Sequence, residues 1–432
     1  MNLKLNHSNI KSKTELVITG SKSETNRLLL LQALFPNLIL KNTSNSDDSE
    51  VMIKALFKAS QRRTDNLESI TINVHHAGTA MRFLTAYFAI QPDCEVILTG
   101  STRMKERPIN ILVEALNSLG ALITYEEVEG FPPIKIKGTQ LTESEISIEA
   151  NTSSQYISAL LLIAPKLKNG LQLNLSGEIT SLPYIKMTLA LLNEIGVKTS
   201  FENNSITVKP ATSNPQPTTI VVESDWSSAS YFYSIVALSN IGTQITLSNY
   251  KKNSLQGDAV LVEIYKDFGV ETTFNENETV TISKININYN INFSSDKNLQ
   301  SLNSNPQLSY NLINSPDIAQ TIAVTCFGLG ISCELTGLHT LKIKETDRLQ
   351  ALKNELEKLG ASVIISSESI TIKTTPKINE NVSIKTYQDH RMAMAFAPLA
   401  LKTALTIEDA EVVSKSYPSF WNDLEMIGFS VE

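Results

Sequence analysis

The stretch ILVEALNSLGALITYEEVEGFPPIKIKG, residues 111–138, contains the pattern on which the predicted fold depends. Its first part has apolar residues three and four positions apart, which is the period of an amphipathic helix. Gly120 ends this run, and a glycine just after the last helical turn can adopt the positive φ that terminates a helix. Two short alternating segments follow, separated by a polar turn. The stretch therefore predicts a helix followed by two strands.

The same pattern recurs along the chain. Further copies have their helix stops at Gly196, Gly269 and Gly360, a truncated copy stops at Gly428, and a degenerate copy occupies residues 51–74. One copy would mean little, because a helix, a glycine and a strand follow one another in many α/β proteins. Repetition indicates a true internal repeat, and we predict six β-and-α units. A loop rich in Pro, Ser and Thr places a domain crossover near residues 215–228.

Composition excludes several classes of protein. The 432 residues are 42% hydrophobic and 19% charged, which is typical of a globular protein of about two or three domains. The net charge of −7 argues against non-specific nucleic-acid binding. Cys94, Cys326 and Cys333 form no C-x-x-C pair, so neither a zinc site nor a disulfide framework is predicted. No signal peptide or membrane-spanning run is visible, and we expect a cytoplasmic protein.

Basic side chains gather where helices are expected to begin. A helix N-terminus attracts anions and slightly disfavours cations, so cations there require an explanation. The residues concerned are Lys22, Arg27, Arg103, Lys105, Arg107, Lys344, Arg348, His390, Arg391 and Lys415. Small or polar residues occupy other predicted helix starts, namely Gly78, Thr79, Ser153, Ser154, Gln155, Ser181 and Tyr184. Each residue alone could be a surface charge or a plain cap, but together they predict a site for multiply charged anions such as phosphates.

Three local arrangements are predicted at these helix starts. Ser21 and Glu24 have the spacing of a capping box. Pro108 is expected to open a helix. Lys344 and Arg348, four positions apart, are expected to share a helix face.

Two acidic residues lie within these stretches. Asp317 follows Ser315 and Pro316 in the predicted first turn of a helix, and Glu345 lies beside Lys344. The structural alternatives are a helix-dipole partner for Asp317 and a surface ion pair for Glu345. The functional alternative is a general base and a general acid working among cations. The sequence leaves both alternatives open.

The motifs as a set resemble the 5-enolpyruvylshikimate-3-phosphate synthase family, in the same order and over nearly the whole chain. They are GSKSETNR (20–27), AGTAMRFL (77–84), TRMKERPI (102–109), SSQY (153–156), SLPYI (181–185), SDWSSASYF (224–232), NSLQGD (253–258), PDIAQT (316–321), KETDRL (344–349), QDHRMAMAF (388–396) and Lys415. The resemblance implies an α/β fold, a two-domain inside-out α/β barrel. Each domain would have three β-α-β-α-β-β repeats with helix N-termini facing the interdomain cleft.

The resemblance also implies where the domains lie and what they do. Residues 21–223 would form the N-terminal lobe, on the shikimate 3-phosphate side. Residues 1–20 plus 224–432 would form the C-terminal lobe, with the catalytic acid and base and the phosphoenolpyruvate side. The implied reaction transfers the enolpyruvyl group of phosphoenolpyruvate to the 5-hydroxyl of shikimate 3-phosphate. It releases phosphate through a tetrahedral addition–elimination intermediate, in the chorismate pathway to aromatic amino acids.

Residue by residue, the resemblance assigns three catalytic groups. Asp317 would accept the proton of the 5-hydroxyl, Glu345 would protonate the phosphoenolpyruvate methylene, and Lys22 would assist. Shikimate 3-phosphate would be bound by Lys22, Ser23, Arg27, Ser153, Ser154, Gln155, Ser181, Asp317 and Lys344. Phosphoenolpyruvate would be bound by Lys22, Gly78, Arg107, Gln155, Arg348, Arg391 and Lys415. No metal or cofactor is implied, and glyphosate would compete at the phosphoenolpyruvate subsite. We expect a monomer that binds neither nucleic acid nor a membrane.

The chain departs from the family pattern at four positions. His76 and Thr340 stand where the family usually has Asn, Phe83 where it has Pro, and Leu341 where it has Trp. A UDP-N-acetylglucosamine enolpyruvyl transferase is one alternative, but the cysteine it normally carries is missing from GSTRMKER (100–107). The acidic net charge disfavours an RNA-end-processing cyclase. The presence of both Asp317 and Glu345 disfavours a non-catalytic anion-binding relative.

Overall fold

The structure, a computed structural model, describes residues 1–60, 69–92, 94–150, 153–177, 179–211, 217–286, 308–373 and 377–432. It divides into two compact units. The N-unit comprises Thr19–Ser224 and Asn253–Gly257, and the C-unit comprises Met1–Ile18, Asp225–Lys252 and Asp258–Glu432. The short segment Asn253–Gly257 belongs to the N-unit although its neighbours in sequence on both sides belong to the C-unit.

The described part of the N-unit contains two four-stranded sheets of the same topology and one smaller sheet. The strand orders are β4-β5-β7-β6 and β8-β9-β11-β10. In each, the first pair of strands is parallel and the other two pairs are antiparallel. The smaller sheet pairs β3 with β12 in parallel. The bounds are β3 Leu38–Lys41, β4 Ile70–Asn73, β5 Glu95–Thr99, β6 Leu122–Tyr125, β7 Ile134–Lys137, β8 Glu145–Glu149, β9 Leu171–Ser176, β10 Thr199–Glu202, β11 Ser205–Val208 and β12 Thr218–Val221.

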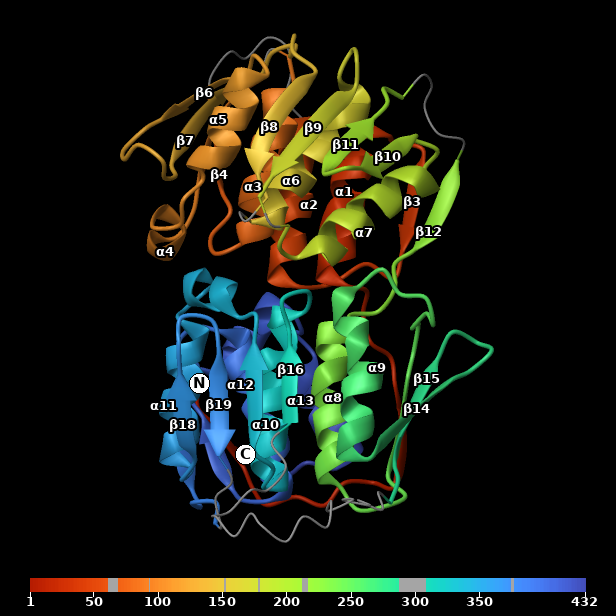
Figure 1. The fold of residues 1–432 in the computed structure, drawn as a ribbon, viewed down its shortest axis with the longest axis vertical. Coiled ribbons are helices and arrows are strands. Elements are labelled where there is room, and N and C mark those ends of the chain that lie inside the picture. Colours follow the sequence, from red (N-terminus) through yellow and green to blue (C-terminus); the bar gives the residue numbers. More distant parts are fainter. Residues whose placement is uncertain are drawn as a thin grey trace, which may run out of the picture. The chain divides into compact units, whose positions relative to one another are not determined.

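The helices of the N-unit pack against one another and share one apolar core with the inner faces of the sheets. Figure 1 shows α1, α3 and α6 in the interior of this unit, whereas the short α4 lies at its edge. Their bounds are α1 Lys22–Leu34, α2 Asp47–Ser60, α3 Gly78–Ala89, α4 Thr102–Lys105, α5 Asn110–Ser118, α6 Ser154–Ile163 and α7 Leu182–Glu194, with the 3₁₀ helix η1 Ala164–Lys166.

The described part of the C-unit repeats this plan. Its four-stranded sheets have the orders β2-β13-β15-β14 and β16-β17-β19-β18, again with one parallel and two antiparallel pairs. A three-stranded sheet has the order β1-β21-β20. The bounds are β1 Leu3–Leu5, β2 Lys13–Leu16, β13 Gln244–Leu247, β14 Val270–Phe274, β15 Val280–Lys284, β16 Leu308–Asn311, β17 Cys333–Thr336, β18 Ser362–Ile365, β19 Ile370–Lys373, β20 Val382–Ile384 and β21 Leu405–Ile407.

In the C-unit α10 packs against both α8 and α12 in a second apolar core, whereas α11 lies at the edge of the unit in Figure 1. The bounds are α8 Trp226–Leu238, α9 Leu261–Ile264, α10 Ala319–Leu329, α11 Arg348–Lys358, α12 His390–Phe396 and α13 Phe420–Ile427. The 3₁₀ helices are η2 Gly257–Val260, η3 Tyr265–Phe268, η4 Pro316–Ile318, η5 His339–Ile343, η6 Ala397–Leu401 and η7 Ala410–Lys415. The predicted α/β class, with helices enclosed by strands, is confirmed.

The glycines that were predicted to stop helices all have the left-handed backbone that this role requires. Their φ angles are 103° at Gly120, 87° at Gly196, 74° at Gly269, 100° at Gly360 and 115° at Gly428. The repeat read from the sequence is therefore real in its four full copies, each of which ends in an antiparallel strand pair.

The degenerate copy at residues 51–74 differs from the prediction. Its helix is α2, but its strand β4 does not complete that copy; β4 pairs with β5 and opens the next sheet. The physical reason is that β3, which precedes α2, finds its partner far along the chain in β12.

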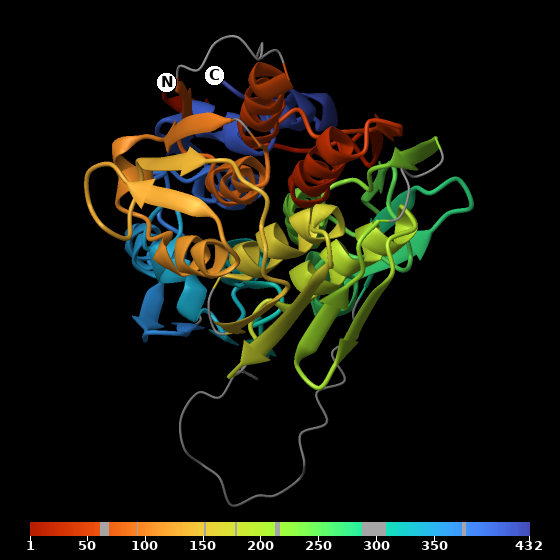
Figure 2. The ribbon, with the colours of Figure 1, turned by 90° about the horizontal axis from the view of Figure 1, so that it is seen from above.

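The two ends of the chain lie next to each other in the C-unit. The backbone N–H of Lys4 donates to the carbonyl of Glu432 at 2.8 Å, and Leu5 forms a bridge with Val431. Figure 2 shows both termini side by side. The C-terminal strand segment that follows α13 is thus held by the first strand of the chain.

Candidate active site

Several interior helices have a first turn that is less buried than the rest. In α3 every residue except Thr79 is buried, in α6 only Ser154 and Gln155 are not, and in α8 only Ser227 is not. A helix that is apolar nearly all round belongs in a core, so a polar, accessible first turn stands out. The first turns of α3 and α6 are among those where the sequence predicted anion binding, because the free N–H groups of a helix point there.

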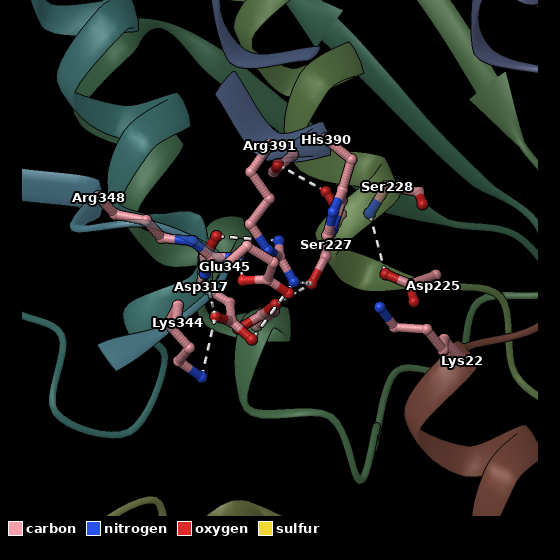
Figure 3. Close-up of polar contacts among 12 residues, drawn as sticks. Lys22, Asp225, Ser227, Ser228, Asp317, Lys344, Glu345, Arg348, His390 and Arg391 are labelled. Carbon is pink, nitrogen blue, oxygen red and sulfur yellow. Dashed lines mark hydrogen bonds and ion pairs between the residues drawn. The ribbon is translucent and has the colours of Figure 1, made fainter. Parts of the chain in front are cut away.

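In the C-unit, the carboxylate of Asp317 lies among three basic side chains (Figure 3). Its Oδ1 is 2.9 Å from Nη1 of Arg348 and 3.6 Å from Nζ of Lys344, and its Oδ2 is 3.3 Å from Nη2 of Arg391. Asp317 lies in η4, just before α10, as the sequence predicted. The residues that meet at this carboxylate come from positions 317, 344, 348 and 391, and we call them the Asp317 cluster.

Arg348 is the anchor of the Asp317 cluster. Its side chain is 2% exposed, and its Nε is 2.6 Å from Oδ2 of the fully buried Asp389. Its Nη2 is 2.7 Å from Oε2 of Glu345. Burial by itself opposes the charge of Arg348, but the carboxylates of Asp389, Glu345 and Asp317 outweigh burial and raise its pKa above the ordinary value. Arg348 therefore stays charged and contacts both Asp317, the predicted base, and Glu345, the predicted acid.

Arg391 is fixed by its own set of hydrogen bonds. Its Nη1 donates to the backbone carbonyl of Asp317 at 2.9 Å, and its Nη2 donates to Oγ of Ser227 at 3.3 Å. Its backbone N–H donates to Oδ1 of Asp389, the N-cap of α12, at 2.9 Å. Lys415, at the end of η7, donates to the carbonyl of Gln388 at 2.6 Å.

The electrostatics of Asp317 follow from these contacts. Its burial favours the neutral carboxylic acid, but the positive charges of Arg391, Lys344 and Arg348 together outweigh burial. They hold the pKa of Asp317 well below its usual range. Asp317 is thus ionised at neutral pH.

In the N-unit, α1 begins at Lys22, whose Nζ is 3.8 Å from Oδ2 of Asp48. The other oxygen of Asp48 is 3.8 Å from Nε2 of His76. Asp48 lies in the first turn of α2 and is 8% exposed, so this carboxylate is shared by two groups that can be cationic. Asp48 could not be recognised from the sequence, because its partners are far away along the chain.

The predicted capping box at Ser21 and Glu24 is wrong. The side chain of Ser21 makes no cap hydrogen bond, and its backbone N–H donates to the carbonyl of Glu223 at 2.7 Å. Glu24 instead accepts from the backbone N–H of Glu223 at 3.2 Å and from Nε2 of Gln256 at 3.4 Å. Glu24 therefore pairs with Glu223 and Gln256, which are remote in sequence, and not with the nearby Ser21.

Arg27 is buried one turn further along α1. Its guanidinium donates to Oγ1 of Thr188 at 2.8 Å, to the carbonyl of Ser23 at 2.8 Å and to Oγ of Ser158 at 3.0 Å. It also lies over the ring of Phe83, 5.4 Å from the centroid. Burial lowers the pKa of Arg27 to about 10.

Gly78 and Arg107 are in direct contact. A Cβ at position 78 would lie 2.7 Å from Nη1 of Arg107 and 3.1 Å from its Cζ, so only a glycine lets the guanidinium approach the start of α3 this closely. The segment after Arg107 is held by the carbonyl of Pro108, which accepts from Nη2 of Arg82 at 3.0 Å and from the hydroxyl of Tyr156 at 2.6 Å.

The hydroxyl and amide residues of the N-unit occupy the starts of α6 and α7. Ser153 is the N-cap of α6 and accepts from the backbone N–H of Gln155 at 3.4 Å. Nε2 of Gln155 donates to Oγ1 of Thr79, at the start of α3, at 3.2 Å. Ser181 precedes α7 with a φ of 54° and makes no cap hydrogen bond. A non-glycine residue held at positive φ is strained, and such strain is common at functional sites.

Two further local predictions are wrong. Helix α5 begins at Asn110, so Pro108 does not open it. Helix α11 begins at Arg348 with Asp347 as its N-cap, so Lys344 is not on a helix face with Arg348. Lys344 has an extended backbone at the end of η5 and reaches the same carboxylate from outside the helix.

The structure therefore brings the predicted residues into separate groups within each unit. Asp317, Lys344, Glu345, Arg348 and Arg391 meet in the C-unit, and Gly78 meets Arg107 in the N-unit. Sequence analysis did not single out Asp48, Asp389, Arg82 and Asp258, which hold or adjoin these groups. For Arg82, Asp258 and Asp389 the available signal was their position inside the quoted motifs, whereas Asp48 lies outside all of them.

Within the described ranges, no three His, Cys, Asp or Glu side chains are grouped so that they could hold a metal ion. None of the helices in these ranges is long and apolar enough to cross a membrane.

Comparison with known sequences identifies close relatives. The sequence profile of the family described as EPSP synthase (3-phosphoshikimate 1-carboxyvinyltransferase) matches residues 8–424. A 3-phosphoshikimate 1-carboxyvinyltransferase of Bacteroides fragilis (strain YCH46) is 44% identical over 425 residues, which cover 97% of this chain and 96% of that protein. The protein of the same name from Photobacterium damsela subsp. piscicida is 36% identical, over 96% of both chains.

Comparison with solved structures identifies the same fold. The EPSP synthase from Acinetobacter baumannii superposes with a TM-score of 0.76 at 19% identity, covering 100% of this chain and 99% of that one. The enolpyruvyl transferase NikO from Streptomyces tendae superposes with a TM-score of 0.72 at 12% identity, covering 100% and 98%.

Proposed function

The chain belongs to the EPSP synthase family, and from this premise we propose how its charged residues carry out the reaction of a 3-phosphoshikimate 1-carboxyvinyltransferase. This activity transfers the enolpyruvyl group of phosphoenolpyruvate to the 5-hydroxyl of shikimate 3-phosphate and releases phosphate. The observation that carries the proposal is that Arg348 of the Asp317 cluster contacts both the ionised carboxylate of Asp317 and the carboxyl group of Glu345.

Asp317 acts as the general base for the 5-hydroxyl. It is ionised, as a base must be, because Arg391, Lys344 and Arg348 hold its pKa low. The same cations would make Asp317 a poor base while the site is empty, because they lower its affinity for a proton. The anionic groups of the substrates compete for these cations, and their negative charge raises the proton affinity of the carboxylate when catalysis requires it.

Glu345 acts as the general acid for the methylene carbon of phosphoenolpyruvate. Its side chain is 22% exposed, so it can take up a proton from water before each turnover. Protonation of the methylene makes C2 electrophilic, and the 5-hydroxyl adds to C2 as Asp317 takes its proton. The tetrahedral adduct then loses phosphate and a proton to give the enolpyruvyl ether.

The remaining residues bind and neutralise the substrates. Shikimate 3-phosphate is assigned to Ser23, Arg27, Ser153, Ser154, Gln155, Ser181, Lys344 and Asp317, with Lys22. Phosphoenolpyruvate is assigned to Lys22, Gly78, Arg107, Gln155, Arg348, Arg391 and Lys415. Charge-assisted hydrogen bonds from these cations are worth about 1.5–3 kcal/mol each and also stabilise the charge that develops on the leaving phosphate. Most of the residues proposed for shikimate 3-phosphate belong to the N-unit, and the proposed acid and base belong to the C-unit.

The proposal is tested by two substitutions that keep side-chain shape. Asp317→Asn and Glu345→Gln should each lower kcat by about 10²–10⁴-fold, the usual contribution of a general acid or base. Substrate affinities should change little. The assay is phosphate release from phosphoenolpyruvate with shikimate 3-phosphate, with UDP-N-acetylglucosamine as the control acceptor. A variant that keeps near-wild-type turnover would remove that residue from the mechanism.

A further inference from the structure

Asp258 is a buried carboxyl beside the Asp317 cluster that the mechanism above does not use. It is 4% exposed and lies in η2, in the motif NSLQGD. Its Oδ2 accepts a hydrogen bond from Oγ of Ser227, and Ser227 is the one residue of α8 that is not buried. Its Oδ1 has no hydrogen-bond partner among the described residues.

Ser227 connects this carboxyl to Arg391. Nη2 of Arg391 donates to Oγ of Ser227 at 3.3 Å and also contacts Oδ2 of Asp317 at 3.3 Å (Figure 3). A guanidinium hydrogen on Oγ orients the hydroxyl so that its own hydrogen points to Asp258. Asp258, Ser227 and Arg391 thus form one chain of hydrogen bonds that ends at the proposed phosphoenolpyruvate site.

Burial and several nearby polar groups act on the ionisation of Asp258. Burial, together with the nearby charges of Asp317 and Asp225, raises the pKa of Asp258 to about 7, although Arg391 and the Ser227 hydrogen bond oppose the rise. Near neutral pH the carboxyl therefore exists both as the neutral acid and as the anion. Such a carboxyl can alter the binding of phosphoenolpyruvate, because it changes charge near neutral pH and is linked to the arginine proposed to bind that substrate.

We propose that Asp258 is a positioning residue that orients Arg391 through Ser227, and whose ionisation weakens the attraction of Arg391 for phosphoenolpyruvate. The proposal rests on the assignment of phosphoenolpyruvate to Arg391 above. When Asp258 is neutral, it adds no negative charge beside the guanidinium of Arg391, which then attracts a further anion strongly. When Asp258 is ionised, a second negative charge lies close by in a buried site, where Coulomb interactions are only weakly screened.

The first test is the pH dependence of the KM for phosphoenolpyruvate in the wild type and in Asp258→Asn. Asn has the shape of the neutral acid and cannot ionise. The ratio of wild-type KM to variant KM should rise at least threefold from pH 6 to pH 8.5, while the ratio of kcat values stays constant. Ionisation of the substrate affects both proteins equally and cancels in the ratio. A KM ratio that is independent of pH would overturn the proposal.

A matched control is Asp267→Asn. Asp267 is an exposed carboxylate of the same unit that also accepts a hydroxyl hydrogen bond, from Tyr310 at 2.7 Å. The ratio of the wild-type KM for phosphoenolpyruvate to that of Asp267→Asn should stay at one across the pH range. If Asp267→Asn reproduces the trend of Asp258→Asn, the trend reflects net charge, and the proposal is wrong.

The second test does not depend on catalysis. A carboxyl whose folded-state pKa lies near 7, against about 3.9 in the unfolded chain, holds its proton more tightly when folded. Raising the pH from the unfolded-state pKa to the folded-state pKa therefore favours unfolding. The stability that the protonated carboxyl contributes is lost completely above about pH 7. The melting temperature of Asp258→Asn relative to wild type should rise by several degrees between pH 4 and pH 7.5. A constant difference would show that Asp258 does not ionise in this range and would overturn the proposal.

A further variant distinguishes two outcomes: either Arg391 does not bind phosphoenolpyruvate, or Asp258 does not affect that binding. Arg391→Gln should raise the KM for phosphoenolpyruvate at every pH. If it does not, the assignment of Arg391 is wrong, and the proposal falls with it. If Arg391→Gln raises the KM and the Asp258→Asn ratio is flat, only the role of Asp258 is overturned.

Discussion

A single carboxylate, that of Asp317, organises the chemistry of the C-unit. Three basic side chains lie within 3.6 Å of it, so its ionisation is set by neighbours rather than by burial. The same neighbours are the groups an anionic substrate would approach. In the proposed mechanism, substrate binding and the base strength of Asp317 are therefore coupled, because each anion that pairs with one of these cations weakens the effect that lowers the proton affinity of Asp317.

Gly78 is the residue at which we expect inhibitor and substrate binding to separate. In Gly78→Ala the new methyl would meet the guanidinium of Arg107 and push it outward. Glyphosate is longer than phosphoenolpyruvate and should suffer more from the loss of space. We expect glyphosate to compete with phosphoenolpyruvate in the wild type, and Gly78→Ala to raise its inhibition constant at least tenfold, or about 1.4 kcal/mol. The KM for phosphoenolpyruvate should rise less.

The measurement is the inhibition constant of both proteins at fixed phosphoenolpyruvate, with Arg107→Gln for comparison. Loss of Arg107 should weaken substrate and inhibitor alike, because it removes a charge that both require. Equal inhibition constants for wild type and Gly78→Ala would show that Gly78 does not line the phosphoenolpyruvate subsite.

Among the helices, the N-caps of α11 and α12 have the same local role but different surroundings. Asp347 caps α11 by accepting from the backbone N–H of Gln350 at 3.1 Å. Asp389 caps α12 in the same way, at Arg391, and in addition pairs with the buried Arg348 at 2.6 Å. Removal of an ordinary cap costs about 1 kcal/mol, whereas removal of one partner of a buried ion pair costs about 3–5 kcal/mol.

We therefore expect Asp389→Ala to lower the free energy of unfolding by about 3–5 kcal/mol and Asp347→Ala by about 1 kcal/mol. Urea denaturation of the two variants at pH 7 measures the difference. Similar losses would mean that Asp389 is a cap only and that Arg348 is compensated by Asp317 and Glu345 alone.

On the scale of the whole molecule, each unit has an apolar core of its own. Leu173 in β9 and Leu247 in β13 are fully buried at equivalent strands of the repeat, one in each core. Replacement of a buried leucine by alanine costs about 2–5 kcal/mol, and the cost falls on the core that loses the side chain.

Scanning calorimetry should therefore show two transitions, one for each core. Leu173→Ala should lower the temperature of one transition and Leu247→Ala that of the other, by several degrees each. If each variant shifts both transitions equally, or if a single transition persists, the two cores unfold as one cooperative unit.

The sequence by itself determined the repeat, its helix stops and the collection of cations at helix starts. These features could be read because consecutive residues encode them: the helical period lies in the side-chain order, and Gly120 or Gly360 permits a positive φ wherever it stands. The motif resemblance then gave the family, which the comparisons confirm.

Only the tertiary structure decided which charged groups meet. Glu24 lost its predicted local partner to Glu223 and Gln256, and Lys344 reached Asp317 from outside the helix in which it was expected. Arg348 pairs with Asp389, 41 positions away, because a buried guanidinium must find carboxylates wherever the packed core offers them. Local spacing contains no information about such partners, since burial makes the choice only after helices distant in sequence have packed together.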